Sequence, residues 1–399
     1  MSLTSPSRRG FITAASALRV MGANDRLKLG VIGAGGRGQY LMRSLNQLGD
    51  QDWVAVCDIY DARRDQAEKI AGHSVAKYGD HRRLIEHKEI DAVIVATPDH
   101  WHAPIAIDAL RAGKDVYVEK PMVHNPRDGQ ALVKAVRETG RVLQVGMQGR
   151  ALPQFVEAKQ KYIESGVMGK IGMARTWYMS NSGYVLEPPP GMERKPAGLD
   201  WDRWLGRGPK VPWNPNIYFS PYKWLHYDGG MIMGIGIHVV DSAHHWLGLK
   251  NPAAAVAGGS TFFYNDGRDT PDVIAFILEY PNKTTVTFSA ECLSAPGVRT
   301  TAGVEARGTG GTLWAERYVV DKGWKYVPNG KFSKASAADG PGTGAAAGGV
   351  LKNWLECIRT RQKPVASVEE GYSSSMACFM ANQAYQRKAR VVWDPAWNI

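Results

Sequence analysis

The sequence predicts an α/β fold in two domains, the first a doubly wound parallel sheet and the second an α+β unit. Short β-branched runs alternate with amphipathic helical patterns from Leu27 to Gly146, and this alternation stops near residue 150. A chain of 399 residues also exceeds the size of one ordinary hydrophobic core. We therefore place the first domain at residues 26–149 and the second at 150–399.

Five segments of the first domain have the composition of buried parallel strands: LKLGVI, WVAVC, DAVIVAT, DVYVE and RVLQVG. Helical periodicity marks two segments between them, APIAIDALRAG and GQALVKAVRETG, each of which ends at glycine. In the second domain, IGMARTWYMS, DVIAFILEY and TTVTFSAECL are strand-like, and PNK between the last two predicts a hairpin turn. Two helical patterns close the chain.

The N-terminal segment SRRGFITAASAL, within residues 1–25, joins two arginines to a short apolar stretch. It resembles a twin-arginine export signal, which predicts a periplasmic protein; the alternative is an N-terminal arm on a cytoplasmic one. No run of about 18 apolar residues predicts a membrane span.

The net charge of +11 is spread over scattered Lys and Arg residues, so we expect no nucleic-acid partner. The four cysteines show no CxxC spacing, which predicts free thiols and no metal site.

The first strand leads into LGVIGAGGRG, a G-x-G-x-x-G pattern that opens a helix. This turn supplies five predicted cofactor contacts, Gly33, Gly35, Gly36, Arg37 and Gly38, with the glycines allowing a tight turn and a close approach to pyrophosphate. Asp58 ends the second strand, where a carboxylate binds ribose hydroxyls and repels a 2′-phosphate. We therefore expect the cofactor to be NAD. NADP is the alternative, because Arg63 and Arg64 lie nearby in the sequence.

Two further motifs, TPDHWH after the fourth strand and EKP after the fifth, make the chain resemble the glucose–fructose oxidoreductase/inositol dehydrogenase/MocA (Gfo/Idh/MocA) family. DWDRWLG, HYDGG, GIHVVD and RVVWDP add to the likeness. The resemblance implies a Rossmann domain followed by a large, mostly antiparallel open sheet, with the nicotinamide at the junction. It also implies homo-oligomers, dimers or tetramers, formed through that sheet.

Lys120 of EKP is predicted to relay a proton where cofactor meets substrate; a surface salt bridge is the alternative. The resemblance also implies a set of cofactor-lining residues: Thr97, Pro98, Trp101, His102, Glu119, Lys120 and Gln148. His102 has an alternative role as a cap of the helix that follows it.

The segment DGGMIMGIGIHVVDSAHHW, residues 228–246, concentrates ionisable groups. Family members usually carry an aspartate four residues before the histidine that matches His238, and here Gly234 takes its place. Three interpretations stay open. His238 is the general base, tuned by Asp241 or Lys120; or His238, Asp241 and His245 ligate a metal; or Asp241, His244 and His245 are buried structural groups. We predict catalytic roles for Lys120, His238 and Asp241.

Lys223, Trp224 and Tyr227 precede the glycine turn and are predicted to line a pocket for a carbohydrate-like substrate, because aromatic rings stack on sugar faces. Core packing is the alternative for Trp224. The sequence thus predicts an NAD-dependent oxidoreductase acting on CH–OH groups of a sugar, glycoside or cyclic polyol. A glycoside hydrolase that retains NAD and oxidises the ring transiently is one alternative, and a non-catalytic NAD-binding sugar sensor is another.

Overall fold

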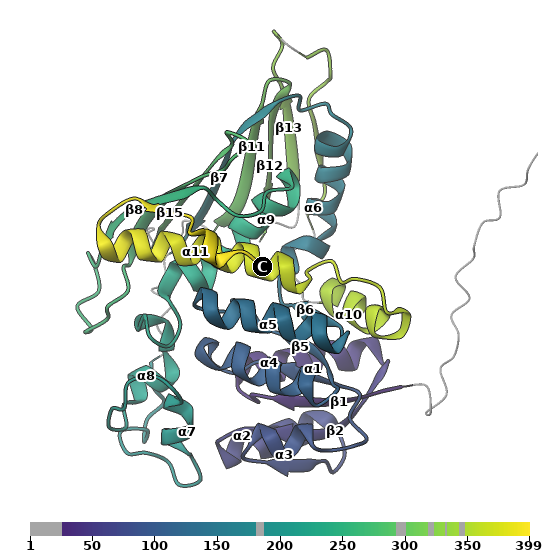
Figure 1. The fold of residues 1–399 in the computed structure, drawn as a ribbon, viewed down its shortest axis with the longest axis vertical. Helices are drawn as coiled ribbons and strands as arrows, with labels where there is room; N and C mark the ends of the chain where they lie inside the picture. Colours follow the sequence, from purple (N-terminus) through teal and green to yellow (C-terminus); the bar gives the residue numbers. More distant parts are fainter. Residues whose placement is uncertain (1–25, 181–186, 293–300, 318–322, 332, 343–347) are drawn as a thin grey trace, which may run out of the picture.

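This computed structural model describes residues 26–180, 187–292, 301–317, 323–331, 333–342 and 348–399, so the predicted export signal lies outside the described residues. Figure 1 shows two sheets, one above the other, with helices between and around them. None of the helices in the described ranges is long and apolar enough to cross a membrane.

The lower sheet has six parallel strands in the order β3-β2-β1-β4-β5-β6. Its strands are β1 (Leu27–Ile32), β2 (Gln51–Cys57), β3 (Ala76–Tyr78), β4 (Ala92–Val95), β5 (Asp115–Val118) and β6 (Leu143–Val145). Its helices are α1 (Gly36–Leu48), α2 (Asp61–Ala71), α3 (His81–Ile85), α4 (His102–Arg111) and α5 (Pro126–Thr139). Val31 and Ile94 pack with α1 and α2, whereas Val93 and Val95 pack with α3, α4 and α5. The predicted doubly wound sheet is confirmed.

One helix of the C-terminal part returns to this sheet. The buried side chains of α10 (Gly348–Thr360), Leu351 and Trp354 among them, join the core formed by β1 and α1. The Trp354 ring meets that of Tyr117 edge-on, with centroids 5.6 Å apart. The boundary expected at residue 150 therefore separates the two sheets but does not separate all of their helices.

The upper sheet has nine strands in the order β14-β13-β12-β11-β7-β10-β9-β8-β15. They are β7 (Ile171–Met179), β8 (Ala254–Ser260), β9 (Val273–Glu279), β10 (Thr285–Glu291), β11 (Thr301–Gly308), β12 (Gly311–Glu316), β13 (Trp324–Pro328), β14 (Ala338–Gly340) and β15 (Val391–Val392). Among the described strand pairs of this sheet, only β7 and β10 are parallel. The large, mostly antiparallel sheet and the β9–β10 hairpin are confirmed.

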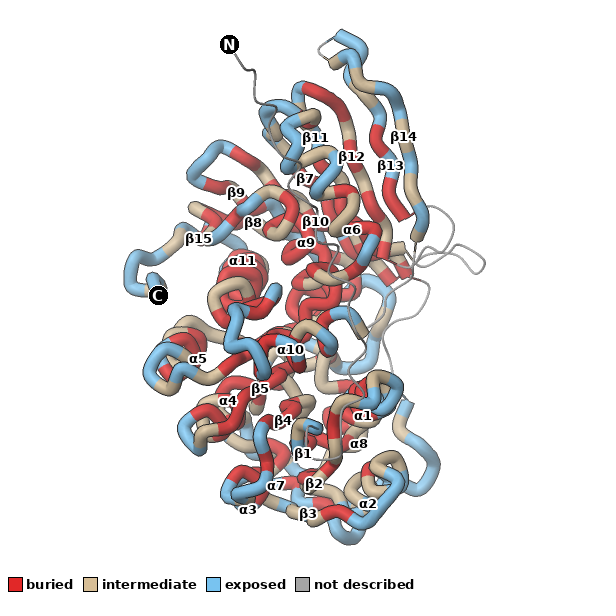
Figure 2. Tube along the Cα trace, turned by 90° about the vertical axis from the view of Figure 1, so that its right-hand side faces the viewer, coloured by how far each residue is buried: buried red, intermediate tan, exposed pale blue. Residues whose placement is uncertain are grey.

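The helices of this half are α6 (Pro153–Ala158), α7 (Trp201–Leu205), α8 (Pro215–Phe219), α9 (Ile237–Leu247) and α11 (Val368–Arg387). Helices α9 and α11 lie between the two sheets, and buried residues concentrate there (Figure 2). On the opposite face of the upper sheet the outward residues of β9 and β10, such as Ile277 and Ser289, stay exposed. The junction between the sheets is thus the buried centre of the molecule.

Candidate active site

Glycine shapes the turn between β1 and α1. Gly33 has a φ of +89°, and a Cβ there would lie 2.6 Å from the backbone of Ala96. A Cβ on Gly38 would lie 2.0 Å from the carbonyl oxygen of Gly33. A Cβ on Gly36, by contrast, would meet nothing within 4 Å. The turn is therefore tightly packed on its protein side and open in front of the helix.

The N-terminus of α1 points into this open space. Gly35 is the N-cap residue, and no described side chain hydrogen-bonds the helix end. Free amide groups and the positive end of the helix dipole favour an anionic ligand. A cavity of about 860 Å³, within the size range of cofactor sites, begins here. The turn therefore fits the pyrophosphate of a dinucleotide.

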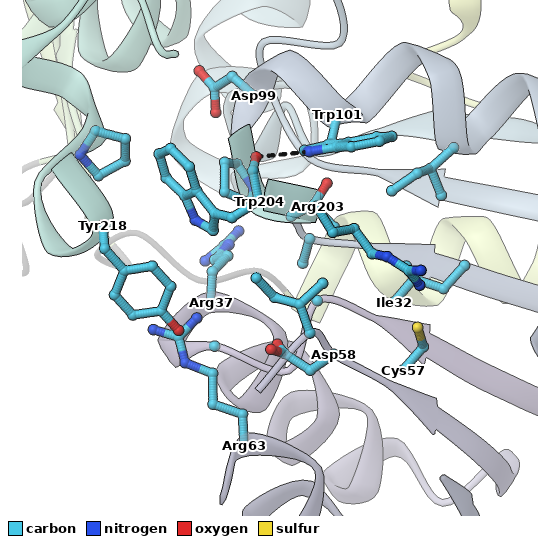
Figure 3. Close-up of a pocket in the computed structure, with 18 of the residues that line it drawn as sticks. Ile32, Arg37, Cys57, Asp58, Arg63, Asp99, Trp101, Arg203, Trp204 and Tyr218 are labelled. Carbon is cyan, nitrogen blue, oxygen red and sulfur yellow. Dashed lines mark hydrogen bonds between the residues drawn. The ribbon is translucent and has the colours of Figure 1, made fainter. Parts of the chain in front are cut away.

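Both halves of the chain supply walls of this cavity (Figure 3). The upper half contributes Arg203, Trp204 and Tyr218, and the indole Nε1 of Trp101 donates a hydrogen bond to the Trp204 carbonyl oxygen at 3.0 Å. Eight of the residues predicted to contact the cofactor line the cavity: Gly33, Gly35, Gly36, Arg37, Asp58, Thr97, Pro98 and Trp101.

Asp58 lies at the end of β2 and is 6% exposed. Its two carboxylate oxygens accept hydrogen bonds from the amides of Ala34 and Tyr60, at 2.8 and 2.9 Å. Burial raises the pKa of Asp58, while the nearby Arg63 and these two amides oppose the rise. The guanidinium of Arg63 also lines the cavity and lies 4.6 Å from the ring centre of Tyr218. Arg64 instead pairs with Asp61.

Three other predicted contacts lie behind the cavity wall. His102 is 1% exposed and is held between the carbonyl oxygens of Thr97 and Pro121, at 2.8 Å from each. Glu119 is 4% exposed and pairs with Arg37, with Nη2 and Oε1 2.7 Å apart. Gln148 is also buried. His102 and Glu119 therefore position cavity-lining groups, and their direct contact with the cofactor stays a prediction.

Lys120 connects the two halves of the molecule. Its Nζ donates a 2.7 Å hydrogen bond to the carbonyl oxygen of Gly234, which lies in the π-helical turn Ile232–Gly236 before α9. This contact brings the end of β5 beside the first turn of α9, which carries His238. The structure thus assembles the two predicted proton-transfer groups at the junction.

The surroundings of His238 are cationic. Burial lowers the pKa of His238 well below its usual value, and the charges of Arg317, Lys120 and Arg37 lower it further. Its Nδ1 atom is buried without a hydrogen-bond partner in the described part of the chain. His238 is therefore neutral at pH 7 but accepts a proton reluctantly.

Asp241 lies one turn further along α9 and is 1% exposed. The Arg150 guanidinium binds both of its carboxylate oxygens, at 2.8 to 3.1 Å, and the Ser374 hydroxyl donates to it at 2.9 Å. Because Asp241 is taken up by this buried ion pair, the geometry corrects its predicted catalytic role to a structural one. His244 is structural too, since it contacts the Tyr280 hydroxyl and Ser373.

The three residues predicted to bind substrate point elsewhere. Lys223 is 3% exposed and pairs with Asp266 at 3.1 Å. The Tyr227 hydroxyl donates to the Pro209 carbonyl oxygen at 2.9 Å, and its ring packs on Trp204. Trp224 packs against the same aromatic cluster. Trp224 and Tyr227 therefore support Trp204 in the cavity wall, and a direct contact of the three residues with substrate stays a prediction.

Sequence reasoning missed Asp99, Asp228 and His124. Asp99 lines the cavity, and its Oδ2 lies 3.3 Å from His124 Nε2. The Asp228 side chain lies close enough to interact with that of Asp99. Asp99 and Asp228 stand inside the quoted motifs TPDHWH and HYDGG, and those motifs were the only available signal.

The metal interpretation finds no geometric support. Asp241 is bound by Arg150, and no cluster of three or more His, Cys, Asp or Glu side chains suited to a metal ion occurs within the described ranges.

The chain matches two family models. One, described as an oxidoreductase family with an NAD-binding Rossmann fold, covers residues 27–147, and the other, the Gfo/Idh/MocA C-terminal domain, covers 206–314. The chain belongs to the Gfo/Idh/MocA family. Its Rossmann domain binds NAD, in agreement with the open helix end and the placement of Asp58.

Individual relatives match only part of their length. The inositol 2-dehydrogenase of Salmonella typhimurium is 34% identical over 146 residues, which are 36% of this chain and 43% of that protein. A glycosyl hydrolase family 109 protein of Stenotrophomonas maltophilia is 28% identical over 288 residues, 64% of this chain and 62% of that protein. The solved structure of a levoglucosan dehydrogenase with NADH and L-sorbose has the same fold, with a TM-score of 0.73 at 20% identity, over 92% of this chain and 99% of that one.

Proposed function

We propose that this Gfo/Idh/MocA protein is an NAD-dependent oxidoreductase that transfers hydride between nicotinamide and a ring carbon of a sugar, glycoside or cyclic polyol. The observation that carries the proposal is the Lys120–Gly234 contact, which joins the cofactor domain to the helix bearing His238. The names of the relatives, an inositol dehydrogenase and a levoglucosan dehydrogenase, support the substrate class.

The residues of this chain divide the work by position. The amides at the start of α1 bind the pyrophosphate, and Asp58 binds the adenosine ribose. NAD supplies the hydride acceptor. Lys120 and His238 lie where the two halves meet and handle the proton of the substrate hydroxyl. Arg37, held by Glu119, and the Trp101–Trp204 contact keep the cavity walls in place.

The test is to follow NADH absorbance and aglycone release together, with purified protein, NAD and a panel of inositols, sugars and glycosides. Net NADH formation with one of the polyols or sugars is the expected result. NADH formation with none of them, at saturating NAD, contradicts the proposal.

A second candidate has one observation in its favour, the match to a glycosyl hydrolase family 109 protein over 64% of this chain. In this candidate the ring is oxidised and reduced again within one turnover. Aglycone would appear in the same assay without net NADH. A non-catalytic sugar sensor would give neither signal.

We also propose a homo-oligomer formed through the exposed face of the nine-stranded sheet, where apolar side chains such as Ile277 lie at the surface. Export to the periplasm by the twin-arginine pathway is proposed from the SRRGF segment alone. Light scattering tests the homo-oligomer. Fractionation of cells that express the Arg8→Lys, Arg9→Lys double variant tests the export.

A further inference from the structure

Two carboxyl groups that the proposed reaction leaves unused lie near Lys120. Asp99 follows β4 and lines the cofactor cavity, whereas Asp228 comes from the segment before α9. The two side chains lie close enough to interact directly. Two carboxyl groups in such contact share a proton, because two negative charges buried side by side repel strongly. The pair therefore carries one proton and one negative charge.

Asp228 faces the same small region as the Lys120 side chain. Its Oδ1 atom is buried and has no hydrogen-bond partner among the residues that the structure describes. This oxygen lies 3.5 Å from the position that a Cβ on Gly234 would occupy. The carbonyl oxygen of the same Gly234 accepts the hydrogen bond from Lys120 Nζ. Glycine at this position thus leaves room for the Asp228 carboxyl group beside Lys120.

The charged groups around the pair come from several elements. Lys120 and His124 favour negative charge on Asp228, and His102 and Lys120 favour it on Asp99, whereas Glu119 opposes it. Burial raises the pKa of both carboxyl groups, and Asp99 raises that of Asp228 further. Burial lowers the pKa of His124 to about 4, so this neighbour is neutral at pH 7.

The reaction also needs an acceptor for a proton, and His238 is a poor one because burial and the charges of three cations lower its pKa. A carboxyl pair with one negative charge near Lys120 is, by contrast, a good proton acceptor. It can take up a proton without creating a buried positive charge.

We propose that Asp99 and Asp228 form a proton-sharing pair that stores, by way of Lys120, the proton released when the substrate hydroxyl is oxidised. This inference rests on the proposed function. The substrate C–H bond breaks with its electron pair, which forms the new C–H bond on the nicotinamide of NAD⁺. The O–H bond breaks and the carbonyl forms; Lys120 takes up the released proton as its ammonium passes one of its own to the pair, whose charge changes from −1 to 0.

Asp228→Asn tests the exchange of the proton separately from the shape of the site. The amide keeps the size of the side chain and a donor toward Asp99, but it cannot take up or release a proton. We expect kcat for oxidation to fall by about 100-fold, the scale of general acid–base catalysis, while the Kd for NAD measured by calorimetry stays within about twofold. In the reductive direction the wild-type rate should fall at alkaline pH as the pair loses its proton. The variant should lack this fall.

An infrared spectrum provides a readout independent of activity. Protein without substrate at pH 7 should show the carbonyl stretch of a protonated carboxyl group, and Asp228→Asn should weaken it. Asp99→Asn tests the pair from its other member and should lower kcat in the same way. Asp269→Asn is the matched control, because this carboxylate accepts only from a backbone amide, that of Leu225 at 2.7 Å, and it should leave kcat unchanged.

A folded Asp228→Asn protein with kcat within about threefold of wild type overturns the proposal, whatever the infrared spectrum shows. Wild-type protein that turns over no substrate contradicts the proposed function instead, and the infrared band then reports on the pair alone.

Discussion

The two ends of the active site are built in different ways. The pyrophosphate end is one continuous turn, Gly33–Gly38, whose shape comes from the backbone and from glycines that exclude a Cβ. The other end, here called the hydroxyl end, is where the substrate hydroxyl would be oxidised. It brings together Lys120 and Gly234, which are 114 positions apart in the sequence. A site made by a local turn depends on local conformation, whereas a site made by side chains from two halves depends on how those halves dock.

The largest effect should come from breaking the buried ion pair that holds α9, the helix of the hydroxyl end. Asp241→Ala removes the main partner of the buried Arg150 guanidinium and should lower the free energy of unfolding by about 3–5 kcal/mol. Urea denaturation measures this loss. The exposed pair Lys352–Glu356 is the control, and Lys352→Ala should change stability by under about 0.5 kcal/mol. Equal losses in the two variants would mean that the buried pair of Arg150 and Asp241 contributes no more to stability than an exposed pair.

The turn can be tested with two alanines placed two residues apart. Gly38→Ala puts a Cβ against the Gly33 carbonyl and should destabilise the protein by about 1–3 kcal/mol. Gly36→Ala meets open space, so it should leave the melting temperature unchanged and weaken NAD binding about tenfold, or 1.4 kcal/mol, where the pyrophosphate would approach. Melting curves and calorimetry separate the two effects. A Gly36→Ala protein that binds NAD normally would place the pyrophosphate elsewhere.

The contrast between a local turn and a site assembled from distant segments explains which features could be predicted from the sequence. The buried parallel strands and the glycine turn have local signals, so β1, β2, β4, β5, β6 and the contacts of Asp58 were predictable. Strands such as β3, with three residues, and β15, with two, are too short to carry a periodic pattern. The partners of Asp241 lie 91 and 133 positions away, and that of Asp228 comes from the other half of the chain, so no local spacing could reveal them. Aromatic composition likewise could not show that Trp224 and Tyr227 pack in the cluster that contains Trp204 and Tyr218.

Asp58 tests the specificity of the cofactor end. The wild-type protein should bind NAD more tightly than NADP, because the carboxylate repels a 2′-phosphate. Asp58→Ala should narrow the difference by about 1 kcal/mol, roughly fivefold in the ratio of the two Kd values. Calorimetry with both nucleotides measures it. Tighter binding of NADP by the wild-type protein would show that Arg63 decides the specificity.

The smallest effect is the pH dependence of the stability that His244 contributes from helix α9. Burial lowers the pKa of folded His244 to about 3, from 6.5 in the unfolded chain, so the unfolded chain binds the proton first as the pH falls. The stability contributed by His244 is complete above pH 6.5 and declines below it. His244→Gln should be less stable than wild type at pH 8, by a margin that shrinks toward pH 5. A constant difference in melting temperature would show that His244 does not titrate in this way.

The most direct test of the account is the effect of Lys120→Met on binding and on turnover, measured in the same preparation. Methionine keeps the length and apolar contacts of the side chain but has no proton to give. The account predicts NAD affinity within about twofold of wild type and a loss of NADH formation of at least about 100-fold, because Lys120 belongs to the hydroxyl end alone. A folded variant that keeps more than about a tenth of the wild-type rate would contradict the role of Lys120 in proton transfer.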